Sequence, residues 1–76
     1  MLNLYTMASV ETLGARIRAA RKGAGLSQEK LAVELGVSWS TVNRYESGKN
    51  SPSLNRLRLI ADVLEVDVSD LLGKAA

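Results

Sequence analysis

The chain has 76 residues with a net charge of +2, and it contains neither Cys nor His. This length suits one domain with a modest core. The missing residue types exclude disulfides, zinc fingers, thiol nucleophiles and histidine general bases. No apolar run approaches the roughly 20 residues of a membrane helix, and the first residues lack the basic flank of a signal peptide. These features fit a cytoplasmic protein, for which we expect no cofactor, no metal and no membrane association.

The charge is distributed unevenly along the chain. Residues 1–60 hold nine Lys or Arg and four Glu, whereas residues 61–76 hold one Lys and four acidic residues. A chain polarised in this way can turn a basic side toward phosphates. An ordinary surface with unevenly placed charges remains the alternative.

The first predicted helix runs from Val10 to Lys22. Its apolar residues recur at helical spacing on one face: Val10, Leu13, Ile17 and Ala20. Ser9 is the candidate cap, Glu11 suits the positive start of a helix, and Gly23 and Gly25 end it.

Two short helices follow, joined by a tight turn. Ser27 is placed to cap a helix over residues 28–35, and Ser38 to cap a second that ends before Gly48. Gly36 lies between them, where the chain must leave a helix through a left-handed residue. This spacing predicts a helix-turn-helix in which the second helix crosses the first steeply. Its outward face carries Trp39, Ser40, Thr41, Asn43 and Arg44.

The remainder of the chain predicts two more helices and no strand. After a loop over residues 49–52, Ser53 caps a helix from Leu54 to Leu64, and Asp67 caps a short helix over residues 66–71. We expect residues 1–8 to be an extension that is disordered or packs on a partner subunit. Residues 9–73 form the domain, and residues 74–76 fray.

The ordered set of these motifs resembles the Cro/repressor (XRE-type) helix-turn-helix family over residues 10–72. The resemblance implies an all-α, compact five-helix lambda-repressor-like domain that binds double-stranded DNA through its second and third helices. The matching pieces are Leu26-Ser27-Gln28, Leu31-Ala32, Leu35-Gly36-Val37-Ser38, Tyr45-Glu46-Ser47-Gly48, Pro52-Ser53-Leu54, Leu57, Ile60-Ala61, Leu64 and Val68-Ser69-Asp70-Leu71-Leu72.

The resemblance implies two sets of DNA contacts. It places Trp39, Ser40, Thr41 and Arg44 in the major groove, with Asn43 more oblique. The guanidinium fork of Arg44 matches guanine, although a solvated side chain or a phosphate contact are the alternatives. The residues implied at phosphates are Gln28, Lys49 and Asn50. Arg56, near the start of the following helix, could reach the same strand. Arg18, Lys22 and Lys30 are taken as ordinary basic surface.

Trp39 departs from the family pattern, in which a small polar residue or Gln is common. Its ring could pack on thymine methyls or on the DNA backbone, or it could fold over the preceding helix as a surface aromatic. The resemblance also implies an ion pair between Arg21 and Glu46, which would hold the recognition helix in place.

One recognition helix reads too few base pairs for selectivity, so we expect a homodimer on a near-palindromic operator. The candidate dimer residues are Val66, Val68, Leu71 and Leu72, which could instead close the core of the monomer. The leading hypothesis is a transcriptional regulator, with a protein-binding or antitoxin-like module on the same fold as the alternative. An enzyme is not expected, because the chain has no plausible catalytic cluster.

Overall fold

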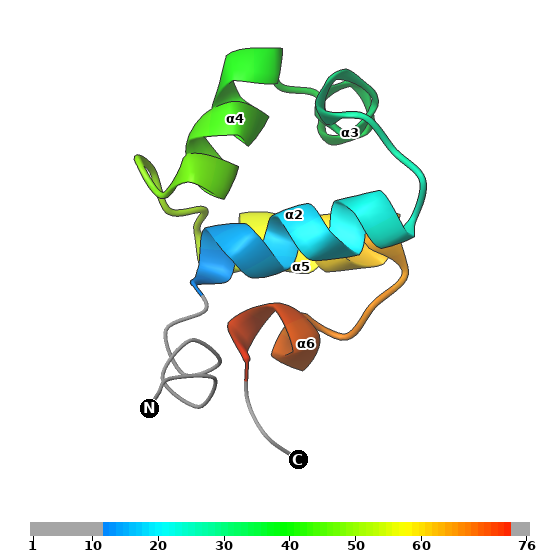
Figure 1. Cartoon of the computed structure of the whole chain (residues 1–76), viewed down its shortest axis with the longest axis vertical. Helices are drawn as coiled ribbons and strands as arrows, with labels where there is room; N and C mark the ends of the chain where they lie inside the picture. The colour runs from blue at the N-terminus through cyan, green and yellow to red at the C-terminus, as the bar shows by residue number, and fades with distance from the viewer. Residues whose placement is uncertain (1–11, 74–76) are drawn as a thin grey trace, which may run out of the picture.

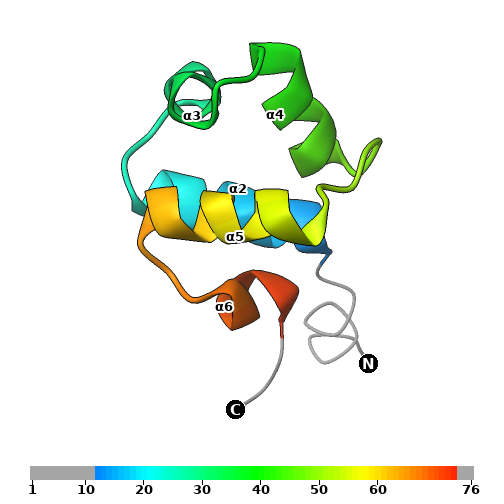
Figure 2. The same ribbon diagram turned by 180° about the vertical axis from the view of Figure 1, so that it is seen from behind.

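The computed structural model describes residues 12–73, which form five helices and no strand. The helices are α2 (Leu13–Gly23), α3 (Gln28–Leu35), α4 (Trp39–Ser47), α5 (Leu54–Leu64) and α6 (Val68–Leu72). Helices α2 and α5 cross the middle of the molecule, with α3 and α4 on one side and α6 on the other (Figures 1 and 2). Helix α4 packs on α2 and α3, and α6 packs on α2 and α5. None of these helices is long and apolar enough to cross a membrane.

Hydroxyl caps start the first four helices of the described chain. In each, a side-chain oxygen accepts from the backbone N–H three residues on, which satisfies one of the unpaired donors at a helix start. These oxygens belong to Thr12, Ser27, Ser38 and Ser53. Asp67 precedes α6, and its N–H donates to Asp70 Oδ2 at 3.2 Å. The predicted caps Ser27, Ser38 and Ser53 are therefore confirmed, and Asp67 occupies the predicted N-cap position of α6.

The predicted start of the first helix was too early. Helix α2 begins at Leu13, because the Thr12 hydroxyl accepts from the Ala15 N–H at 3.1 Å and Thr12 itself is extended. The predicted start at Val10 and the candidate cap Ser9 lie outside the described residues, as do the expected extension (1–8) and the expected frayed tail (74–76).

Left-handed residues follow four of the helices. Gly36, Gly48 and Gly73 have φ of 72°, 84° and 73°, and glycine adopts this region without a Cβ penalty. Helix α5 is followed instead by Glu65, whose φ is 59°. A residue with a side chain costs about 1–2 kcal/mol in this conformation.

The core draws on every described helix. Its buried hydrophobic residues are Ile17, Leu31, Ala32, Leu35, Val42, Leu57, Ile60, Ala61, Leu64 and Leu71. Leu71 is only 1% exposed, so its expected place in a dimer interface was wrong. The short helix α6 turns Leu71 inward between α2 and α5, which is the alternative that the sequence left open.

Helix α2 approaches the backbone of α4 closely at Gly14. An added Cβ at Gly14 would lie 2.6 Å from the carbonyl oxygen of Tyr45 and 2.5 Å from that of Glu46. These are backbone atoms, which cannot swing aside as a flexible side chain could. Gly14 therefore permits the close packing of α2 on the C-terminal turn of α4.

We predict that Gly14→Ala destabilises the domain by about 1–3 kcal/mol, because the methyl group overpacks the contact between the helices. Gly23→Ala is the matched control in the same helix, since nothing lies within 4 Å of an added Cβ there. It should be neutral or stabilise by up to about 1 kcal/mol. Urea unfolding of both variants tests this, and equal effects would contradict the role of Gly14.

Candidate nucleic-acid interface

Helices α3 and α4 are joined by a turn of three residues. Gly36 takes the left-handed conformation, and Val37 N–H donates to Ala32 O at 3.0 Å, which closes the end of α3. Ser38 then caps α4. This local geometry sends α4 across α3 on the outside of the molecule (Figure 1).

The two sides of α4 differ sharply. Val42 is fully buried and Tyr45 packs on the core, whereas Ser40 and Arg44 are exposed one helical turn apart. Trp39 is 47% exposed at the first position of the helix. Of the other predicted base-reading residues, Thr41 and Asn43 are half-buried and flank the exposed strip. The exposed strip of α4, which is centred on Ser40 and Arg44, is therefore polar, and the rest of the described chain leaves it open.

A cluster of hydroxyl groups surrounds the start of α4. Ser38 Oγ lies 3.0 Å from Ser40 Oγ and 3.1 Å from Thr41 Oγ1, and it also accepts from the Thr41 N–H. Two of the predicted base-reading hydroxyls are therefore hydrogen-bonded to the cap residue. Their orientation is set before any ligand arrives.

Glu46, in the last turn of α4, is the hub of a buried hydrogen-bond network. Its carboxylate accepts from Arg21 Nε at 2.6 Å and Nη2 at 3.1 Å, and from Gln28 Nε2 at 2.9 Å. The Arg21 and Glu46 side chains are 8% and 4% exposed. Arg21 Nη1 also donates to Leu26 O at 2.8 Å. The network thus joins the last turn of α2, the start of α3 and the last turn of α4.

The hydrogen bonds that Arg21 donates to Glu46 raise the pKa of Arg21, and this outweighs the lowering by burial; attraction to Glu46 and Glu29 adds to the rise. A raised pKa means that the stability Arg21 contributes is fully present below its unfolded pKa and is lost only as pH rises through the folded value. That range is far above neutral pH. Arg21 therefore stays charged under working conditions.

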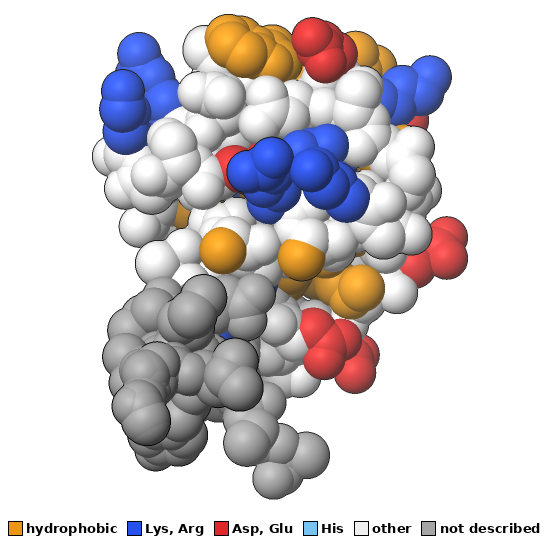
Figure 3. All heavy atoms as spheres, viewed as in Figure 1, with side chains coloured by type: hydrophobic (Ala, Val, Ile, Leu, Met, Phe, Trp, Pro, Cys, Tyr) orange, Lys and Arg blue, Asp and Glu red, His pale blue; other side chains and the backbone are white. Residues whose placement is uncertain are grey.

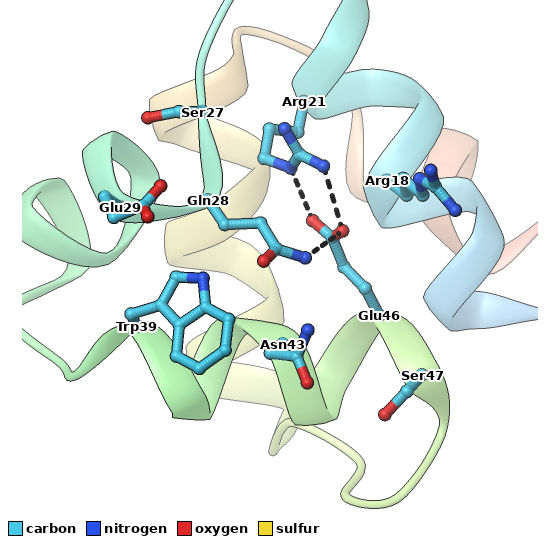
Figure 4. Close-up of a pocket in the computed structure, with 9 residues that line it drawn as sticks. All are labelled: Arg18, Arg21, Ser27, Gln28, Glu29, Trp39, Asn43, Glu46 and Ser47. Atoms are coloured by element: carbon cyan, nitrogen blue, oxygen red, sulfur yellow. Dashed lines mark hydrogen bonds and ion pairs between the residues drawn. The ribbon is translucent and has the colours of Figure 1, made fainter.

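Beside α4, the structure has a polar hollow (Figure 4). The residues that line this polar hollow are Arg18, Arg21, Ser27, Gln28, Glu29, Trp39, Asn43, Glu46 and Ser47. The Trp39 ring lies at one wall near Gln28, and Asn43 follows it by one turn on the same flank of α4. The ring is thus placed beside the start of α3, and Trp39 as a whole is still 47% exposed.

The predicted site residues fall into two groups. Gln28, Trp39, Asn43 and the Arg21–Glu46 pair meet at the polar hollow, whereas Ser40, Thr41, Arg44, Lys49, Asn50 and Arg56 lie outside it. Lys49 and Asn50 are exposed in the loop after α4, and both backbone N–H groups donate to Arg44 O. Arg56 is half-buried in the first turn of α5.

Ser47 and Arg18 line the polar hollow but were not among the predicted DNA contacts. Ser47 is exposed seven residues after Ser40 and three after Arg44, so helical spacing could have placed it on the same strip. Arg18 lies on α2, and only the packing of α2 on α4 brings it to the polar hollow. Basic side chains gather in the middle of the face shown in Figure 3, over α2, whose exposed basic residues are Arg18 and Lys22.

A capped helix, a three-residue turn and a second helix with an exposed polar strip define the helix-turn-helix class of DNA-binding domain. Residues 17–71 match the helix-turn-helix family. The chain belongs to the Cro/repressor (XRE) type of this family, whose members are DNA-binding transcriptional regulators. The predicted family and the predicted lambda-repressor-like fold are confirmed.

Curated relatives carry the same pattern. An uncharacterized HTH-type transcriptional regulator of Sinorhizobium medicae is 42% identical over 57 residues, which are 75% of this chain and 41% of that protein. The cryptic phage CTXphi transcriptional repressor RstR of Vibrio cholerae is 36% identical over 61 residues, which are 80% of this chain and 54% of that protein. The chain therefore spans about half the length of these relatives.

Solved structures have the same fold. The DNA-binding domain of the P22 c2 repressor matches with a TM-score of 0.76 and 30% identity, over 80% of each chain. The biofilm regulator SinR, in a complex with DNA, matches with a TM-score of 0.74 and 35% identity, over 80% of this chain and 98% of that one.

We predict that Glu46→Gln destabilises the domain by about 3–5 kcal/mol, because it leaves the Arg21 guanidinium buried without its counter-charge. Urea unfolding measures this loss. Glu34→Gln, an equal loss of charge at an exposed position on α3, is the control and should change stability by less than about 0.5 kcal/mol. Similar values for the two variants would show that the pair contributes little.

Proposed function

We propose that this chain is a sequence-specific transcriptional regulator that binds a near-palindromic operator in double-stranded DNA as a homodimer. The observation that carries the proposal is the exposed polar strip of α4, held on the domain by the Arg21–Glu46–Gln28 network. A rigid strip of this kind can enter the major groove and keep a constant register.

In this proposal Arg44 and Ser40 read base edges at the centre of the strip. Arg44 is exposed, and its fork fits guanine O6 and N7, a contact that discriminates by about 1–3 kcal/mol. Trp39 and Asn43 contact base edges from the side of α4 that borders the polar hollow. Thr41 is half-buried and bonded to Ser38, so its methyl rather than its hydroxyl is the better placed for a base contact.

Four residues are proposed to hold the DNA backbone. Gln28 donates one amide N–H to Glu46, which leaves its second N–H for a phosphate near the start of α3. The exposed loop residues Lys49 and Asn50 would contact the backbone beyond the end of α4, and Arg56 would reach the same strand. Such contacts set position and do not read sequence.

The homodimer is proposed because two half-sites about 34 Å apart supply the selectivity that one helix lacks. Helix α6 and the turn before it offer an apolar surface for the dimer: Leu72 is 42% exposed, and Val66 and Val68 are half-buried. Leu71 is excluded, since it belongs to the core of the monomer. RstR is named as a repressor and SinR was solved with DNA, which supports the assignment to DNA-dependent regulation.

We predict that the chain binds random duplex DNA with a steep dependence on salt and enriches a near-palindrome from a random pool. Arg44→Ala should change which sequence is enriched, because it removes a base contact. Lys49→Ala should weaken all sequences alike and lower the salt slope by about 1.

The same experiment distinguishes the proposed regulator from the alternative function of this fold. A protein-binding or antitoxin-like module would show no enriched sequence, and its association with its partner would be insensitive to Arg44→Ala. That result would overturn the proposed regulator.

We predict that Leu72→Asp weakens self-association, because it places a charge in the proposed apolar contact. Sedimentation equilibrium measures the dimer, and binding to the complete operator should fall while binding to a single half-site is unchanged. Val33→Asp is the matched control, since Val33 is 73% exposed on α3. If Leu72→Asp left the dimer as stable as Val33→Asp does, the interface would lie elsewhere.

A further inference from the structure

We infer that Arg18 contacts a phosphate of the DNA strand that Gln28 also contacts. The polar hollow would then bind the DNA backbone through residues of α2 as well as α3. This inference rests on the proposed binding of DNA. The proposed contacts otherwise come from α3, α4, the loop after α4 and α5, and none of them comes from α2.

The position of Arg18 gives the first argument. It lines the polar hollow together with Gln28, Asn43 and Ser47, and its own side chain is exposed. In Figure 4 the side chains of Arg21 and Gln28 converge on Glu46, whereas that of Arg18 extends away from it. In a docked helix-turn-helix the first helix crosses the DNA backbone, and the polar hollow lies at the start of that helix, α3.

The charges give the second argument. Arg21 forms an ion pair with Glu46, so the charges of these two residues offset each other. Glu29 also lines the polar hollow, so that without Arg18 the charges of the lining residues would sum to a net negative charge. A net negative charge would repel a DNA phosphate, and the positive charge of Arg18 offsets it. The planar guanidinium of Arg18 can also bind two oxygens of one phosphate.

The neighbouring basic residue is a natural comparison. Lys22 lies one turn further along α2 and is also exposed, but it does not line the polar hollow. If Arg18 acted only through the general basic field of the surface, the loss of either charge would have the same effect. A direct contact makes the two residues differ.

The test uses the duplex that the wild-type chain itself selects, with Arg18→Ala, Lys22→Ala and Gln28→Ala measured across a salt series. We expect Arg18→Ala to lower the salt slope by about 1 and to weaken all sequences alike. Lys22→Ala should lower the slope by clearly less. Urea unfolding of Arg18→Ala should be unchanged, since the side chain is exposed.

A second measurement locates the contact. Methylphosphonate groups, which remove the charge of one phosphate at a time, are placed along each strand. Arg18→Ala should become insensitive to neutralisation at one phosphate, which is the same as or adjacent to the phosphate at which Gln28→Ala becomes insensitive. Insensitivity on the opposite strand, or equal slopes for Arg18→Ala and Lys22→Ala, would overturn the inference. Failure of the wild-type chain to bind any duplex would instead overturn the proposed function.

Discussion

The contact between Arg21 and Glu46 is the interaction on which the orientation of α4 depends. Arg21 and Glu46 form a bidentate pair between the last turns of α2 and α4, and the two residues are 25 positions apart in the sequence. The isolated halves of such a pair would be costly to bury, so each residue requires the other and both require the native packing. Gln28 adds the start of α3 to the same carboxylate. The three helices that line the polar hollow are thus joined through one side chain.

This arrangement links stability to recognition without placing the ion pair among the proposed base contacts. Glu46 uses both oxygens within the protein, which keeps its negative charge away from phosphates. The amide of Gln28 is oriented by the same carboxylate, and the hydroxyls of Ser40 and Thr41 are oriented by Ser38. Side chains that are already ordered lose less conformational entropy on binding. The fold therefore orders side chains of the proposed interface in advance.

Local signals in the sequence predicted most of the fold. The caps Ser27, Ser38 and Ser53, with Gly36 and Gly48, placed α3, α4 and α5 correctly because these residues act on backbone groups within the nearest turn. The start of α2 was misplaced, since apolar spacing continues upstream of Thr12 and does not show where hydrogen bonding begins. Arg18 and the inward turn of Leu71 depend on contacts between helices, which spacing along one helix does not contain.

The close approach at Gly14 has a consequence for how such a protein can acquire new targets. Because backbone rests almost directly on backbone there, the tilt of α4 has little room for adjustment. The exposed residues Ser40, Arg44 and Ser47, by contrast, can be exchanged without disturbing any core contact. Proteins of this lineage would then acquire new target sequences by replacing exposed side chains of α4. The orientation of α4 on the domain would stay the same.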